Sequence, residues 1–482
     1  MTWGRPMIRG KSAAVLAVLV AGAGSPGAEE EAKRAIPVSS SSPTARAAFE
    51  RGLAAADNNR DAEAAQELRA ALKIDPQFRL AQAWLGKVTP GAPGLELLSK
   101  AAEGDEVLPP AERALIDHLV AVRRDDPKAL ALGRKLVQLA PDDWRSHQLL
   151  AEYLDALGDH AESADEARKA LALDPGAGAA WSQLGYALIR QGRGREALEA
   201  FRRLAELAPQ EPNARDALGE SLMLLGRLDQ AEAAFRKATQ LSSAFYLGWE
   251  GAAYCNFYRG LYDIGRADVS RSIEAVRRED ERLDQYRLFA WSFLAAGDGK
   301  TALALLATLE QSPLRGWQAA QDRGSFLIEM GRTAEGLEAL QLAWKRADQA
   351  GLSGDQRSVL EREGNAFRLL GEVSAGNLKD AQKTADRLIL LAHGRRGKAW
   401  ASVLAFARGK LLLARGDSAA ALKALSGCIA EDPLCRRELL RVLTLSRSPQ
   451  ADQAREALLR EGRRTPLDLY VRAQIARGAP PR

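Results

Sequence analysis

A repeat of 34 residues is the feature of this sequence that most limits how the chain can fold. The clearest unit spans residues 178–211, and besides Trp181 its landmarks are Leu184, Gly185, Leu188, Gly192, Ala197 and Phe201. Positions 34 residues further on are Leu218, Gly219, Leu222, Gly226, Ala231 and Phe235. A period of this length is typical of stacked units, because each unit can bury its apolar face only against its neighbours. The period therefore predicts one regular, elongated architecture.

Each unit reads as two amphipathic helices. Small residues at Gly185 and Ala197 allow the two helices to cross closely, Gly192 suits the tight turn between them, and Pro209 ends the second helix. The composition agrees, because 46% of residues are hydrophobic, 27% are charged and β-branched residues are sparse. We expect an all-α fold.

The spacing Trp–Leu–Gly, Ala–Phe, Pro resembles the tetratricopeptide repeat. The resemblance implies a right-handed α-solenoid, or superhelix, of about 12 antiparallel helix pairs over residues 45–462. A capping helix and tail would follow in residues 463–482. The "SP-x-A-R-x-x-F-x-x-G" pattern from Ser42 to Gly52 is also similar to exported bacterial proteins of this family. The strongest repeats are 178–211 and 212–245, good ones are 45–78, 144–177, 317–350 and 402–435, and weaker ones are 79–109, 110–143, 246–279, 280–313, 355–391 and 436–462.

The N-terminus reads as an export signal. Basic residues at Arg5, Arg9 and Lys11 precede a short apolar run, residues 12–24, and small residues follow. We expect a signal peptide over residues 1–28, a linker over residues 29–44 and a soluble protein in the periplasm or outside the cell. The alternative is an uncleaved membrane anchor, and the cleavage site stays open.

Little of the chain is left for catalysis once the repeats are counted, so we expect a protein that is not an enzyme. The four histidines are scattered and lack the spacing of metal ligands. The stretch "GDGKT", residues 297–301, lacks the earlier glycine and the preceding strand of a phosphate-binding loop. We therefore expect no metal, no cofactor and no small-molecule substrate. An enzyme with an unrecognised groove site is kept as a remote alternative.

Three cysteines are too few for a disulfide scaffold. Cys428 and Cys435 lie seven residues apart, and whether they form a bridge is left open, because geometry decides it. Cys255 is expected to pack as a small apolar residue.

Seven of the 28 aromatic residues lie in residues 244–263. Trp249 occupies the packing column of the repeat, and Phe245 and Tyr246 lie at the junction between repeats, where burial is common. Tyr262 begins the second helix and is also expected to be structural. The remaining three form one helical stripe with Glu250: Tyr254, Phe257 and Tyr258. By resemblance to the family, this side of the first helix lines a concave groove that binds peptides.

The leading hypothesis is a non-enzymatic protein–protein interaction scaffold that binds an extended peptide or protein segment in this groove. A basic or amphipathic partner suits its charges, and its aromatic residues are of the kind that anchor partners. The alternative is that a tight superhelix buries the rings against one another. The candidate partner-binding residues are Tyr186, Arg190, Asp216, Glu220, Glu250, Tyr254, Phe257, Tyr258, Arg287 and Trp291.

Charge is distributed unevenly along the chain. Residues 392–482 hold 18 Lys and Arg against 8 Asp and Glu, a net of +10, whereas residues 29–391 carry −8. This polarity suggests a second hypothesis, an envelope assembly or structural factor whose basic surface, including Arg436, Arg437 and Arg441, contacts an anionic surface or an acidic partner. The alternative is that arginines simply solvate these helices. Nucleic acid is not expected, because basic and aromatic residues do not alternate.

Overall fold

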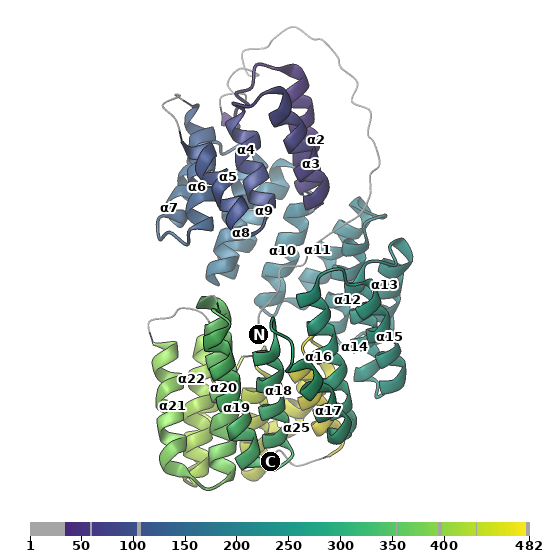
Figure 1. Ribbon diagram of the computed structural model, residues 1–482, viewed down its shortest axis with the longest axis vertical. Coiled ribbons are helices and arrows are strands. Elements are labelled where there is room, and N and C mark those ends of the chain that lie inside the picture. Colours follow the sequence, from purple (N-terminus) through teal and green to yellow (C-terminus); the bar gives the residue numbers. More distant parts are fainter. Residues whose placement is uncertain are drawn as a thin grey trace. The chain divides into compact units, whose positions relative to one another are not determined.

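The computed structural model describes residues 34–57, 60–103, 108–352, 354–393, 398–429 and 431–478. These ranges form 25 helices and no strand, so the predicted all-α fold is confirmed (Figure 1). The helices follow one another as twelve pairs, α2 with α3 through α24 with α25, and α26 comes last. The predicted signal peptide, residues 1–28, lies outside the described residues. In the ranges above, no helix is both long enough and apolar enough to cross a membrane.

The chain divides into two compact units near residue 218. The first unit comprises residues 5–218, and each of its helices from α2 to α10 packs against the next. Its helices are α2 (Pro43–Asp57), α3 (Asp61–Ile74), α4 (Arg79–Val88), α5 (Gly91–Ala102), α6 (Pro110–Arg123), α7 (Ala129–Leu139), α8 (Trp144–Leu157), α9 (His160–Leu173), α10 (Gly178–Arg190), α11 (Gly194–Leu207) and the first half of α12 (Pro212–Leu224).

The second unit comprises residues 219–482 and is also built from consecutive helix pairs (Figure 1). Its helices after α12 are α13 (Leu228–Leu241), α14 (Tyr246–Tyr258), α15 (Tyr262–Ala275), α16 (Glu279–Ala296), α17 (Gly299–Leu309), α18 (Gly316–Glu329), α19 (Thr333–Gln349), α20 (Gly354–Ser374), α21 (Leu378–Ala392), α22 (Lys398–Ala414), α23 (Ser418–Leu425), α24 (Pro433–Leu445), α25 (Gln450–Arg460) and α26 (Pro466–Ala476).

Close approach of the two helices in a pair depends on glycine, as the repeat predicts. A Cβ at Gly185 in α10 would lie 2.5 Å from the ring of Phe201 in α11. One repeat later, a Cβ at Gly219 would lie 2.7 Å from the ring of Phe235. Real Cβ atoms do not approach so closely, so the large aromatic ring needs a residue without a side chain opposite it.

The turns between paired helices also recur at the repeat length. Gly158, Gly192, Gly226 and Gly260 lie 34 residues apart and have φ angles of 87°, 76°, 73° and 79°. Residues with a side chain rarely adopt this left-handed conformation, whereas glycine does so at little cost. The period in the sequence is therefore the period of the helix pairs.

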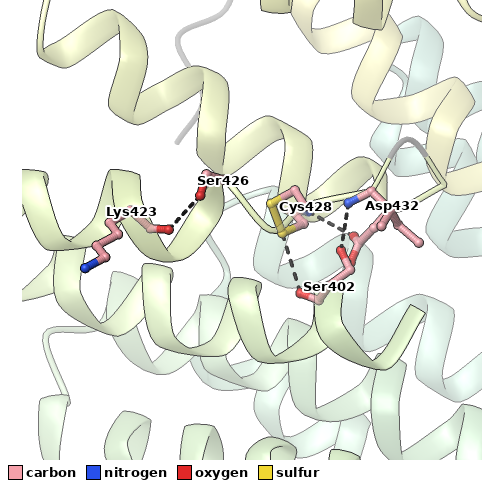
Figure 2. Close-up of a disulfide and its surroundings, with 7 residues drawn as sticks. Ser402, Lys423, Ser426, Cys428 and Asp432 are labelled. Atoms are coloured by element: carbon pink, nitrogen blue, oxygen red, sulfur yellow. Dashed lines mark hydrogen bonds between the residues drawn. A yellow bond between two sulfur atoms is a disulfide. The ribbon is translucent and has the colours of Figure 1, made fainter. Parts of the chain in front are cut away.

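A disulfide joins Cys428, just after α23, to Cys435 in the first turn of α24, with the two Cα atoms 5.5 Å apart. Beside it, the Ser402 hydroxyl donates to Asp432 over 2.9 Å, and Asp432 accepts from the backbone N–H of Cys435 (Figure 2). The question that the sequence left open is thus answered by a bridge. Cys255 is a free, buried cysteine, as predicted.

The last helix, α26, packs against more than the end of the stack. It contacts α24 and α25, as a cap would, and it also contacts α14 and α16. Its apolar residues Tyr470, Val471 and Ile475 belong to the main hydrophobic cluster of the second unit. They share that cluster with Trp291 of α16 and Phe326 of α18, so α26 completes the core of this unit.

Candidate functional site

The predicted partner-binding residues are divided between the two units. Tyr186, Arg190 and Asp216 belong to the first unit, and the other seven belong to the second. In the first unit, Tyr186 is half-buried with its ring edge-on to Phe201, at 5.0 Å between centroids. Arg190 pairs with Asp155, and Asp216 is buried in α12. These three residues therefore belong to a different unit from the aromatic stripe of α14.

In the second unit, a segment from the C-terminal end of the chain lies against α12 and α14. We call Glu461–Thr465, which joins α25 to α26, the arm. Both ends of the arm have extended backbone, with φ and ψ of −76° and 114° at Glu461 and −133° and 137° at Thr465. The residues of α12, α14, α16 and α18 that hold the arm and α26 form the receiving face: Met223, Leu247, Glu250, Tyr258, Trp291 and Glu329.

Backbone contacts fix the course of the arm. The N–H of Gly462 donates to the carbonyl of Met223 over 3.2 Å. The N–H of Arg463 donates to the hydroxyl of Tyr258 over 3.1 Å, and that hydroxyl also lies against the carbonyl of Arg463. The same hydroxyl is 2.8 Å from the Asp468 carboxylate. One tyrosine of the predicted stripe therefore holds both the arm and the first turn of α26.

Arg464 supplies the side-chain contacts of the arm. Its Nη2 donates to the carbonyl of Leu247 over 3.0 Å and lies 3.4 Å from Glu250 Oε1. Its guanidinium also lies over the ring of Phe235, 5.4 Å from the centroid. Gln285 fixes the other oxygen of Glu250 by donating to it over 2.6 Å. Glu250, one of the predicted partner-binding residues, thus lies against Arg464, a basic residue near the C-terminal end of the sequence.

Among the residues of α26, only the last one, Ala476, is exposed. The buried residues include Asp468, Leu469, Val471 and Ile475, which point in several directions around the helix. The ring of Tyr470 meets Trp291 edge-on, 5.9 Å between centroids, and Arg472 lies over the ring of Tyr258. A helix buried all round is surrounded by its unit, so the receiving face and its neighbours enclose α26.

A buried acidic residue anchors the middle of α26. The Tyr470 hydroxyl and the Gln474 amide both donate to Glu329 Oε2 over 3.2 Å. Burial alone would raise the pKa of Glu329, yet Arg437, 2.9 Å away, holds that pKa below its usual value. Burial raises the pKa of Asp468, against the opposing effect of the Tyr258 hydroxyl and Arg463. Glu329 therefore stays charged and accepts hydrogen bonds from α26.

The other predicted residues of the second unit have varied roles. Tyr254 is buried and packs against Phe257 and Tyr258. Phe257 stacks on Tyr262 of α15, so it belongs to the interior of its own helix pair. Arg287 makes two hydrogen bonds, of 2.6 and 3.1 Å, to Asp322 of α18. Glu220 is half-buried in α12.

The three arginines of the expected basic surface all lie close to carboxylates of the same unit. Arg437 is only 3% exposed and pairs with Glu329, because α24 turns it inward. Arg436 pairs with Glu461 at 3.3 Å, and Arg441 lies 3.9 Å from Glu438. The acidic residues of the same unit thus engage these three arginines. Reasoning from the sequence missed Arg464, Asp468 and Tyr470, although the opposite charges of residues 29–391 and 392–482 were a signal for such pairing.

No group of three or more His, Cys, Asp or Glu among the described residues could hold a metal ion. The family model that matches the chain is the tetratricopeptide repeat, over residues 19–77 and 182–244. These matches fall on a chain that is made of helix pairs at the same period. The chain carries tetratricopeptide repeats. Comparison with curated proteins gives no significant match.

Among solved structures, this chain is similar to MamA from Desulfovibrio magneticus RS-1, at 20% identity and a TM-score of 0.33. The likeness covers 37% of this chain and 98% of that chain. YrrB, described as a tetratricopeptide-repeat protein with an unusual peptide-binding site, is 21% identical over 39% of this chain and 97% of its own, with a TM-score of 0.31. A tetratricopeptide-repeat protein from Parabacteroides merdae ATCC 43184 is 16% identical over 56% of this chain and 93% of its own, with a TM-score of 0.36.

Proposed function

We propose that this tetratricopeptide-repeat protein is a non-catalytic scaffold whose receiving face binds a basic segment of a partner protein. Repeats of this family generally serve as scaffolds for protein interaction. The observation that carries the proposal is the seating of the arm, because the receiving face already holds an extended basic stretch that continues into a helix. In this structure the arm and α26 occupy the face.

The contacts of the arm fit the recognition of a peptide. The Met223 carbonyl and the Tyr258 hydroxyl contact backbone atoms, so these two contacts recognise the extended backbone itself. Glu250 and the Leu247 carbonyl contact a guanidinium, so they select a positive charge. The face therefore combines general affinity for extended backbone with a preference for arginine.

A partner must compete with the chain's own segment. A tethered segment acts at an effective concentration on the order of millimolar, so a free peptide of equal affinity displaces it poorly. A partner succeeds if it binds more tightly or reaches further repeats. Loosening the arm without altering the receiving face is therefore the way to reveal the site.

Export through residues 1–28 is part of the proposal. The disulfide between Cys428 and Cys435 supports it, because such bonds persist in oxidising compartments and are rare in the reducing cytosol. The second hypothesis, an envelope factor with a basic surface, is the less favoured one, because Arg436, Arg437 and Arg441 lie close to carboxylates within the unit.

The test is a photo-crosslinking amino acid at Leu247, in cells, with Gly462→Ala to loosen the arm. A Cβ at Gly462 would lie 2.9 Å from both Met223 Cγ and Tyr258 Cε2, so the arm must shift. We expect adducts to a second protein that increase with Gly462→Ala and disappear with Glu250→Lys. Gly427→Ala is the control, because a Cβ there meets its nearest atom at 3.4 Å, an ordinary contact. Adducts confined to the chain's own arm in every variant would contradict the proposed function.

A further inference from the structure

We infer that the partner segment carries the pattern Gly-Arg-Arg-Thr or Gly-Arg-Arg-Ser, followed by a helix with an Asp in its first turn and an aromatic residue two positions later. This inference rests on the proposed function and takes the arm and α26 as a stand-in for the partner. Each element of the pattern follows from a different contact of the receiving face.

The glycine follows from the space available. At Gly462 the backbone passes between Met223 and Tyr258, and a Cβ would come within 2.9 Å of both side chains. Its N–H at the same time donates to the Met223 carbonyl. Any side chain would push the backbone away from this acceptor, so the position requires glycine.

The two arginines follow from their acceptors. Arg463 is 6% exposed, and its Nη2 lies 3.4 Å from Glu431. Arg464 reaches the Leu247 carbonyl and Glu250 with one guanidinium while stacking over Phe235. A lysine has a compact ammonium that cannot also present a flat face to a ring, so arginine suits this position better.

The Thr or Ser and the Asp follow from the start of the helix. The Thr465 side chain accepts a hydrogen bond from the N–H of Asp468 over 3.2 Å and so caps α26. Asp468 is buried and faces the Tyr258 hydroxyl at 2.8 Å. Thr465 and Asp468 have the spacing of a capping box, and Asp468 in addition contacts the receiving face.

The aromatic residue follows from Trp291 and Glu329. Tyr470 places its ring edge-on to Trp291 and its hydroxyl 3.2 Å from Glu329. Aromatic side chains with a polar tip supply much buried area at interfaces together with one directed hydrogen bond. Tyrosine is therefore the residue that this position fits best.

The experiment exchanges the segment in the complete protein. A recognition sequence for a specific protease replaces Ser446–Pro449, the turn between α24 and α25, and the folded protein is cut there. A fluorescent peptide of residues 450–477 is added, and fluorescence anisotropy reports its entry in place of the resident fragment. Unlabelled peptides then compete with it: the unaltered sequence, Gly462→Ala, Arg464→Ala, and Arg455→Ala as a control at an exposed position of α25.

We expect the Gly462→Ala and Arg464→Ala peptides to compete at least about tenfold less well than the unaltered peptide, because each loses or strains a directed contact. Arg455→Ala should compete as the unaltered peptide does. Equal competition by all four peptides would overturn the recognition pattern and leave the proposed function standing. Failure of the unaltered labelled peptide to enter would overturn the proposed function itself.

Discussion

At the scale of single residues, Glu211, in the turn between α11 and α12, is a buried carboxyl group with a raised pKa. Its side chain is buried, and Oε2 has no hydrogen-bond partner among the described residues. Burial raises the pKa of Glu211 to about 7, with Arg60 opposing the shift and Glu63 adding to it. The unfolded chain releases this proton near the ordinary value of 4.5. Between these two values the folded state binds more protons, so stability falls as the pH rises from about 4.5 to 7.

Glu211→Gln should therefore stabilise the protein at pH 8, by about 2 kcal/mol, and have little effect at pH 4.5. The amide removes the charge that burial disfavours and keeps the shape of the side chain. Thermal unfolding of both proteins at the two pH values measures the difference. Glu206→Gln, at an exposed position of α11, is the matched control. A stabilisation of equal size at both pH values would show that the charge of Glu211 is not the cause.

At the scale of elements, α24 joins the disulfide to the buried ion pairs of the second unit. Cys435 lies in its first turn, and Arg437 and Glu438 follow in the second. Arg437 holds Glu329, while Glu438 lies 2.9 Å from the buried Lys410. The N-terminal end of α24 therefore positions two buried ion pairs, Arg437 with Glu329 and Glu438 with Lys410. Removing one partner of such a pair leaves a buried charge unpaired, which is strongly destabilising.

Removing the disulfide with Cys428→Ser and Cys435→Ser should lower the free energy of unfolding by about 2 kcal/mol, the value for a short closed loop. The loss should be concentrated in α24 and α26, because α24 carries the anchor of Glu329. Urea unfolding and hydrogen exchange measure the two effects. Added reductant should reproduce them in the unaltered protein, whereas Cys255→Ser provides the comparison for loss of a thiol. Unchanged exchange in α26 would contradict the coupling.

The elements themselves follow closely from the sequence. Glycines at the repeat period end the first helix of several pairs, and the same period places the close contact of Gly185 with Phe201. The position of α26 does not follow, because it has no counterpart in the repeat. The repeat register of the sequence was sufficient to distinguish Tyr258 from the aromatic residues that pack within the repeats. Its contact with Asp468, 210 residues away, depends on the curvature that many pairs produce together.

At the scale of the whole molecule, the two units should respond separately to substitutions in their cores. Gly185→Ala would place a Cβ against Phe201 in the first unit, and Gly409→Ala would place one against Leu425 in the second. Each overpacked contact should cost about 1–3 kcal/mol.

Hydrogen exchange should show faster exchange around α10 and α11 in the first variant, and around α22 and α23 in the second. In a chain of repeats, stability is a sum of local terms and nearest-neighbour terms, so the effect should fade within a few pairs. The two variants act as controls for each other. Loss of protection throughout the chain in either variant would contradict the division into two units.

The burial of α26 also affects the order in which the protein can be made. The ribosome releases α14 about 210 residues before the first turn of α26, so at 5–20 residues per second Tyr258 waits roughly 10 to 40 seconds for Asp468. During that time Tyr258 and Trp291 face the solvent without α26 to cover them. A nascent chain of this protein thus exposes aromatic core residues until translation is nearly complete. A chaperone that shields aromatic residues would have its greatest effect in that interval.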